Sequence, residues 1–174
     1  MKNWIIIQGI MTKSKNYILN WLSGCHFCNE AKQYVTSVSN ILHDDYKSLK
    51  CDEFDDIYAW DTDKYEKSKR SGHSEETVDM VIALDYGKLL MTEAKLNVKK
   101  IDNLKGEIED KISHTKDYIA SSINFKYCVP SIVLINAENF QSKYNRFRKL
   151  RNDKNDIIPM TLHGFYNYLI ENMK

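Results

Sequence analysis

The sequence predicts an α/β protein with a mixed central β-sheet flanked by helices. Short runs rich in apolar and β-branched residues stand at 77–84 and 127–135, as expected for strands. Longer segments at 26–42 and 98–121 repeat apolar residues at steps of three and four, which is the period of an amphipathic helix. This alternation of strands and helices is typical of an α/β fold.

The chain has 174 residues, the size of one domain, so we expect a single domain over residues 1–174. Its hydrophobic fraction of 43% and charged fraction of 28% are ordinary for a soluble globular protein and argue against disorder. No apolar run approaches a membrane span, and the N-terminus lacks a small-residue cleavage site. Four cysteines do not make a disulfide framework at this length. We therefore expect a cytoplasmic protein with reduced thiols and no membrane partner.

The N-terminal part of the chain predicts few regular elements. Two apolar patches, WIII (4–7) and YILNWL (17–22), are compatible with either helix or strand. A helix is expected over 26–42, after Gly24. IYAW (57–60) fits a short strand, and the polar segment that ends in RSGHSEE has the Gly and Ser content of a mobile loop.

A β-hairpin is expected next. TVDMVIAL (77–84) and LLMTEAK (89–95) are its strands, and DYGK (85–88) has turn chemistry, with Gly87 available for positive φ. Asp85 lies in this turn and is expected to have a structural role. The hairpin therefore leaves its other charged residues as candidates for a functional site.

The remaining chain predicts a helix, a strand and two further helices. Residues 98–121 form a long amphipathic helix despite Gly106, and residues 127–135 form a fully buried strand. A charged helix is expected over 139–152 and a terminal helix over 163–173.

The charged residues are unevenly distributed, although the net charge is only +1. Residues 44–63 contain eight acids and two lysines, whereas residues 143–154 contain six bases and one acid. A basic segment of this kind either binds phosphates or forms the solvated face of a helix, and composition leaves both interpretations open.

Asp79, Glu93 and Lys95 are expected to surround one point in space. The start of the first hairpin strand lies across from the end of the second, which brings Asp79 close to Glu93. Glu93 and Lys95 are two residues apart, so their side chains share one face of the strand. Carboxylates of this kind can hold Mg²⁺, and a divalent cation can neutralise a phosphodiester, activate a water and stabilise the leaving oxygen. The lysine would orient the water or assist its deprotonation.

The sequence Asp79, thirteen residues, Glu93-Ala94-Lys95 resembles the motif of the PD-(D/E)XK nucleases, the restriction-endonuclease-like superfamily. The resemblance implies a metal-dependent nuclease in which Asp79, Glu93 and the backbone carbonyl of Ala94 bind Mg²⁺ or Mn²⁺ while Lys95 assists the attacking water. Val78 stands where the family often has proline.

The resemblance also implies a restriction-endonuclease-like core in the order helix, three strands, helix, strand (αβββαβ). This core would occupy about 26–135, followed by a C-terminal helical extension over 136–174. Some members add a glutamate from the first core helix, for which Glu30 is the candidate.

DNA is the expected partner, and RNA is left open. Candidate nucleic-acid contacts are polar or basic side chains on the two helices that follow the hairpin: His114, Tyr118, Arg146, Arg148, Lys149 and Arg151. A homodimer is expected where both strands of a duplex are cut, because two cuts need two sites.

The motif GCHFCNEAK (24–32) supports rival interpretations. Cys25 and Cys28 form a Cys-x-x-Cys pair at a helix start, which resembles the active site of glutaredoxins and thioredoxins and would imply a thiol-disulfide oxidoreductase. A structural zinc site is another interpretation, in which Cys25 and Cys28 are joined by Cys51 and a fourth ligand from His26, His73 or Cys128. Two free, partly buried cysteines are the simplest interpretation. A noncatalytic nuclease-like interaction module is the remaining alternative to an enzyme.

Overall fold

The computed structural model describes residues 2–24, 28–69, 76–85, 87–98, 104–120, 130–149 and 157–173, without the side chains of residues 2–12, Cys28, Lys105, Tyr118, Arg148 and Lys149. The helices are α1 (Lys2–Ser23), α2 (Cys28–Lys32), α3 (Val38–Asp45), the 3-10 helix η1 (Asp52–Phe54), α4 (Thr62–Ser68), α5 (Leu104–Ala120), α6 (Phe140–Lys149) and α7 (Leu162–Asn172). The strands are β1 (Val35–Ser37), β2 (Tyr58–Asp61), β3 (Met80–Ala83), β4 (Leu89–Lys95), β5 (Ser131–Ile135) and β6 (Ile157–Met160).

The strands form one six-stranded mixed sheet in chain order, from β1 to β6. Neighbours are antiparallel from β1 to β4 and parallel from β4 to β6. The parallel pairs need crossovers, and the chain makes them through α5 and α6. The predicted fold class, a mixed sheet flanked by helices, is therefore confirmed.

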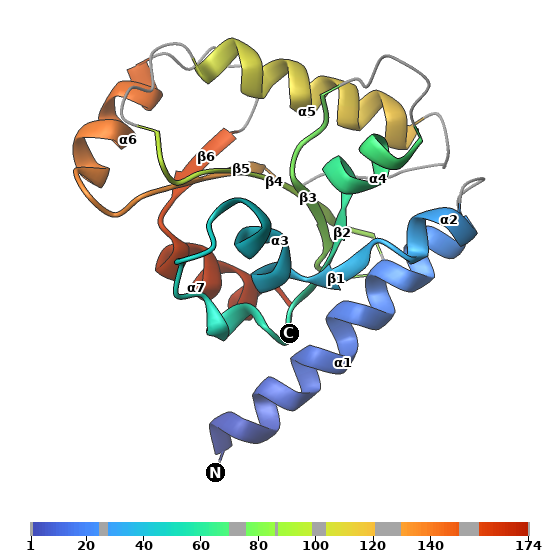
Figure 1. The fold of residues 1–174 in the computed structure, drawn as a ribbon. Coiled ribbons are helices and arrows are strands. Elements are labelled where there is room, and N and C mark those ends of the chain that lie inside the picture. Colours follow the sequence, from blue (N-terminus) through green and yellow to red (C-terminus); the bar gives the residue numbers. More distant parts are fainter. Residues whose placement is uncertain are drawn as a thin grey trace.

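Alternation along the strands divides the core into two layers. On β4, Leu90 and Ala94 belong to the cluster that includes α3 and α7, whereas Leu89 and Met91 belong to the cluster that includes α1 and α5. Figure 1 shows α5 on one side of the sheet and α3 and α7 on the other. Both faces of the central strands are buried, which is why their sequences read as continuous apolar runs.

The predicted hairpin forms as expected, with Met80 paired to Thr92 and Ala83 paired to Leu89. In the turn, the backbone amide of Gly87 donates to the Asp85 carboxylate at 2.7 Å, so Asp85 does have the structural role predicted for it. The prediction of a strand at 57–60 is also confirmed by β2.

The single helix predicted over 26–42 is wrong. The chain forms the short helix α2, then β1, then α3. The β-branched residues Val35 and Thr36 pair with β2 instead of continuing a helix, and Ser37 starts α3 by accepting a hydrogen bond from the amide of Asn40 at 3.3 Å. The two apolar patches near the N-terminus both lie in α1.

The C-terminal part contributes more than an added pair of helices. The predicted helices appear as α6 and α7, but β6 lies between them and extends the sheet. Phe165 of α7 stacks on Phe54 with ring centroids 5.8 Å apart, inside the core. None of the helices in the described ranges is long and apolar enough to cross a membrane.

Candidate active site

Asp79 and Glu93 lie side by side where the two strands of the hairpin end. Met80 pairs with Thr92 in the antiparallel hairpin. The residue before Met80 therefore lies opposite the residue after Thr92, which places Asp79 beside Glu93. The backbone amide of Asp79 donates to Oε2 of Glu93 at 3.2 Å, and the backbone amide of Ala94 donates to Oδ2 of Asp79 at 2.6 Å. The structure thus brings the two acids together, as the hairpin register predicts.

Two lysines meet at one oxygen of Glu93. The Glu93 side chain is only 1% exposed. Neighbouring residues of a strand point to opposite faces, and since Ala94 faces α3 and α7, Glu93 faces α5. Nζ of Lys95 lies 3.0 Å from Oε1 of Glu93, and Nζ of Lys111 from α5 lies 2.8 Å from the same atom. Lys95 also contacts Oε1 of Glu107 at 2.7 Å. The site therefore holds three carboxylates and two ammonium groups.

This clustering changes the proton affinities of the groups. Burial and the neighbouring Glu93 carboxylate raise the pKa of Asp79 to about 7, although the amide of Ala94 and the two lysines limit the rise. Burial alone would lower the pKa of Lys95, but its contacts with Glu107 and Glu93 outweigh burial and raise it. Lys95 therefore remains an ammonium group at neutral pH.

Tyr46, the residue after α3, holds the backbone on either side of Lys95. Its hydroxyl donates to the carbonyl of Ala94 at 3.0 Å and accepts from the amide of Leu96 at 3.3 Å. Burial is the main reason that the pKa of Tyr46 is raised, and the charge of Asp79 adds to it. The hydroxyl consequently stays protonated, and it occupies one side of the Ala94 carbonyl.

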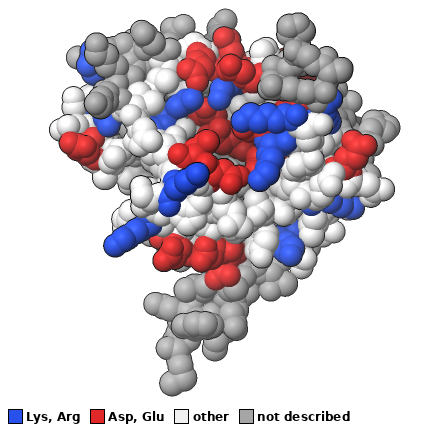
Figure 2. Space-filling model, viewed as in Figure 1, with Lys and Arg blue, Asp and Glu red and all other residues white. Residues whose placement is uncertain are grey.

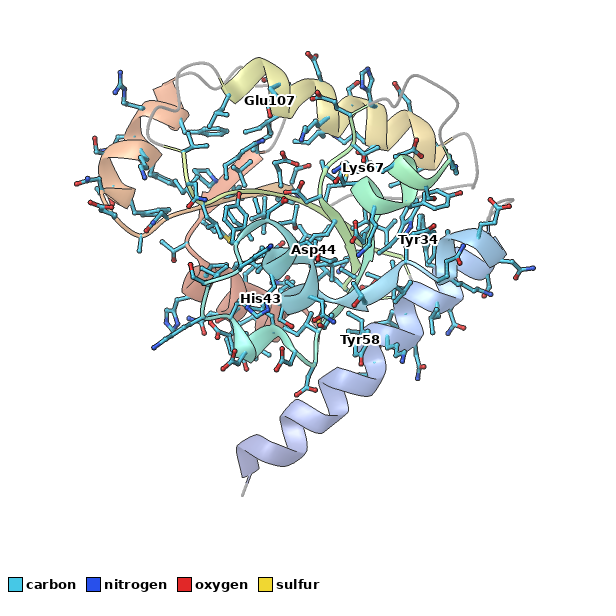
Figure 3. The ribbon with its side chains drawn as sticks, viewed as in Figure 1. Tyr34, His43, Asp44, Tyr58, Lys67 and Glu107 are labelled. Atoms are coloured by element: carbon cyan, nitrogen blue, oxygen red, sulfur yellow. The ribbon has the colours of Figure 1, made fainter. Side chains whose placement is uncertain are left out.

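Asp79 also lines a pocket of about 340 Å³ to which α3 and α4 contribute most of the other lining residues. The other lining residues are mostly charged: Ile41, Asp44, Asp45, Asp61, Asp63, Lys64 and Lys67. Figure 2 shows acidic side chains in a hollow at the middle of one face, with basic side chains around it. In Figure 3, Asp44 comes from α3, Lys67 from α4 and Glu107 from α5. Much of the acidic stretch at 44–63 is thus gathered beside Asp79.

Asp61 is the most buried acid of this pocket, with 5% of the residue exposed. It caps α4 by accepting a hydrogen bond from the amide of Lys64 at 2.8 Å. Burial raises the pKa of Asp61 to about 6, and the hydrogen bond and charge of Lys64 limit the rise.

Several predicted site residues are not brought into this cluster. Glu30 is exposed on α2, which packs on α1, and it is not among the residues that line the pocket beside Asp79, so its role as a further ligand stays a prediction. The helix before β2 is α3, and it places Asp44 and Asp45 at the pocket instead.

The candidate nucleic-acid contacts lie mostly outside the described side chains. His114 is exposed on α5, one turn beyond Lys111, and Arg146 is exposed on α6. Tyr118, Arg148 and Lys149 lie in helices, but their side chains are not described, and Arg151 lies outside the described residues.

The structure does not test the redox and zinc interpretations of the Cys25-x-x-Cys28 pair, because most of the residues concerned are not described. Cys25, His26, His73 and Cys128 lie outside the described residues, and Cys28 begins α2 without a described side chain. Cys51 is buried as a free thiol, with Sγ 3.3 Å from Nε2 of His43. Burial and the nearby acids Glu53, Asp52 and Asp55 raise the pKa of the Cys51 thiol. The zinc and redox interpretations both stay predictions.

Lys111, Glu107 and Tyr46 were not predicted as site residues. The sequence contains a feature from which Lys111 could have been predicted. It lies on the side of α5 that includes the buried residues Ile108 and Ile112, and a lysine among buried residues predicts a buried carboxylate partner. No local feature of the sequence predicts the role of Tyr46, because its contact with Ala94 joins residues 48 positions apart.

Within the described ranges, no group of three or more His, Cys, Asp or Glu residues is arranged to hold a metal ion. The Asp79–Glu93 pair supplies two carboxylates, which is the number that Mg²⁺ sites often take from the protein. Comparison of the chain with models of known families, with curated proteins and with solved structures finds no match.

Proposed function

We propose that this protein is a divalent-cation-dependent nuclease that hydrolyses phosphodiester bonds of DNA at the Asp79–Glu93–Lys95 cluster. The observation that supports this most directly is that two acids and a lysine from the two hairpin strands meet at one buried point. The order α3, β2, β3, β4, α5, β5 also agrees with the αβββαβ order of the nucleases that the motif resembles.

The donor set fits a hard cation such as Mg²⁺ or Mn²⁺. Asp79 and Glu93 offer carboxylate oxygens, the ligands that these cations prefer. The Ala94 carbonyl already accepts one hydrogen bond from Tyr46, so only its second lone pair is available. When bound, the cation would neutralise phosphate charge and lower the pKa of an attacking water.

The residues of the chain have distinct roles in this proposal. The amides of Asp79 and Ala94 hold one oxygen of each carboxylate in place. Because Nζ of Lys95 and Nζ of Lys111 both contact Oε1 of Glu93, a cation would bind this carboxylate in competition with the two ammonium groups. Lys95 is held as an ammonium by Glu93 and Glu107. It is therefore suited to donate a hydrogen bond and stabilise negative charge, and not to accept the proton of the water.

The test compares the wild-type chain with Glu93→Gln. Cleavage of plasmid and linear DNA in Mg²⁺ or Mn²⁺ should fall by about 100-fold or more, because a direct ligand is lost. Asp85→Asn is the matched control, since Asp85 lies in the turn of the same hairpin and should leave cleavage unchanged. Metal-dependent cleavage that survives Glu93→Gln would place the active site elsewhere. Parallel reactions with single-stranded DNA and RNA assign the substrate class.

The proposal places the protein in the cytoplasm, where the buried Cys51 thiol would stay reduced. It also includes a homodimer for cleavage of both strands of a duplex. A chain that folds and binds DNA but does not cleave it would instead be a noncatalytic nuclease-like module.

A further inference from the structure

We propose that Lys111 of α5 binds the scissile phosphate of the nucleic acid at the Asp79–Glu93 pair. This inference rests on the proposed function and adds to it a substrate-contacting residue that the sequence motif does not include. It follows from the contacts of the two lysines that meet at Glu93: Lys95 also contacts a second carboxylate, that of Glu107.

The two lysines have different numbers of partners. Lys95 contacts both Glu93 and Glu107, at 3.0 and 2.7 Å. Lys111 has Glu93 as its carboxylate partner, at 2.8 Å, among the interactions of the described residues. An ammonium group has three N–H donors, so Lys111 retains more donor capacity for an arriving phosphate oxygen.

Lys111 is also held in a fixed position relative to Asp79. The hydroxyl of Thr115, one turn further along α5, donates to the backbone carbonyl of Lys111 at 2.7 Å and accepts from the amide of Val78 at 3.0 Å. Val78 directly precedes Asp79, so a single buried hydroxyl joins the helix turn that bears Lys111 to the segment that bears Asp79, just before β3. A phosphate-binding group placed in this way needs little reorganisation.

The burial of Lys111 distinguishes it from Lys116 of the same helix. Its side chain is 14% exposed and lies beside the apolar residues Ile108 and Ile112. Lys116 lies on the same helix and is exposed. An ammonium in a poorly solvated position interacts more strongly with a phosphate than an exposed one does.

The experiment compares wild type, Lys111→Gln and the matched control Lys116→Gln. Binding of a fluorescein-labelled DNA duplex is measured by anisotropy in Ca²⁺ across a salt series, and cleavage is measured in Mg²⁺. Lys111→Gln should lower the cleavage rate at least about 10-fold and reduce the slope of log affinity against log salt by about 1, whereas Lys116→Gln should change neither. Mn²⁺ affinity of the protein alone should not fall in Lys111→Gln, because the variant keeps both carboxylates.

A second measurement uses the wild-type chain and so does not depend on the folding of a variant. Reductive methylation followed by mass spectrometry should show Lys111 protected by the duplex in Ca²⁺ and Lys116 unprotected. Absence of protection at Lys111, or wild-type cleavage and salt slope in a folded Lys111→Gln variant, overturns the inference.

The outcomes also separate this inference from the proposed function. If the wild type binds DNA with protection of Lys111 but cleaves nothing, the phosphate contact is supported and the nuclease activity is not. If the wild type cleaves DNA while Lys111 is neither protected nor needed, the activity is supported and the role of Lys111 is rejected. If the wild type binds no nucleic acid, both are rejected.

Discussion

Asp79 and Glu93 fix each other in place through the backbone. Glu93 accepts a hydrogen bond from the amide of Asp79, and Asp79 accepts one from the amide of Ala94, next to Glu93. Both carboxylates are thus oriented without a cation, although their charges repel each other. Such an arrangement opposes the stability of the fold and is typical of sites that bind or react.

Asp79→Asn should weaken metal binding without lowering the stability of the fold. The amide retains an oxygen that can accept the hydrogen bond from Ala94, but it removes a charge that burial and Glu93 both disfavour. Calorimetric titration with Mn²⁺ should show an affinity at least about 10-fold lower, and urea unfolding at pH 8 should show equal or higher stability. A variant that binds Mn²⁺ as wild type does would rule out Asp79 as a ligand.

Asp61→Asn should raise stability at high pH only. The pKa of Asp61 is about 6 in the fold, against about 3.9 in the unfolded chain, so the folded state binds more protons between these values. The stabilisation from protonated Asp61 is complete below about pH 4 and is lost as the pH rises through 6. Asn can also cap α4.

The expected gain in the free energy of unfolding for Asp61→Asn is about 1 to 3 kcal/mol at pH 8, vanishing near pH 4. Among the charged groups near Asp61, Lys64 lowers its pKa, and Asp63 and Asp44 raise it. Lys67, Asp45 and Asp79 line the same pocket. Urea unfolding at pH 4, 6 and 8 measures the effect, and Asp110→Asn, which alters an exposed acid of α5, is the control. A loss of stability at pH 8 contradicts the prediction.

Tyr46→Phe should loosen the end of β4. The change removes the hydroxyl that bridges the Ala94 carbonyl and the Leu96 amide, and it should lower the free energy of unfolding by about 1 to 2 kcal/mol. Hydrogen exchange at the amide of Leu96 should become faster than in wild type. Tyr168→Phe is the control, because no hydrogen bond of its hydroxyl is described. Unchanged exchange at Leu96 would show that the bridge does not hold this segment.

Phe165→Ala should destabilise the whole domain and not only its C-terminal end. Phe165 is fully buried and stacks on Phe54, on the face of the sheet that α3 also covers. The expected loss is about 3 to 5 kcal/mol in urea unfolding. Asn167→Ala, an exposed change on the same helix, should shift the free energy by less than about 0.5 kcal/mol. A small effect of Phe165→Ala would mean that α7 is a separable extension.

The sequence by itself determined the local features of this protein. The hairpin, its turn and the meeting of Asp79, Glu93 and Lys95 follow from the two-residue alternation of strands and from a short turn, so nearby residues suffice to predict them. The long helix of residues 104–120 and the buried strand of residues 131–135 likewise follow from local apolar spacing.

The tertiary structure decided what depends on contacts between distant segments. Local patterns did not predict strands β1 and β6, which form because pairing with neighbouring strands satisfies their backbone groups. The places of Tyr46, Lys111 and Glu107 around the hairpin depend on how α3 and α5 pack on opposite faces of the sheet. Local periodicity specifies which face of a helix is buried, but the packing of the whole chain decides which charges that face meets.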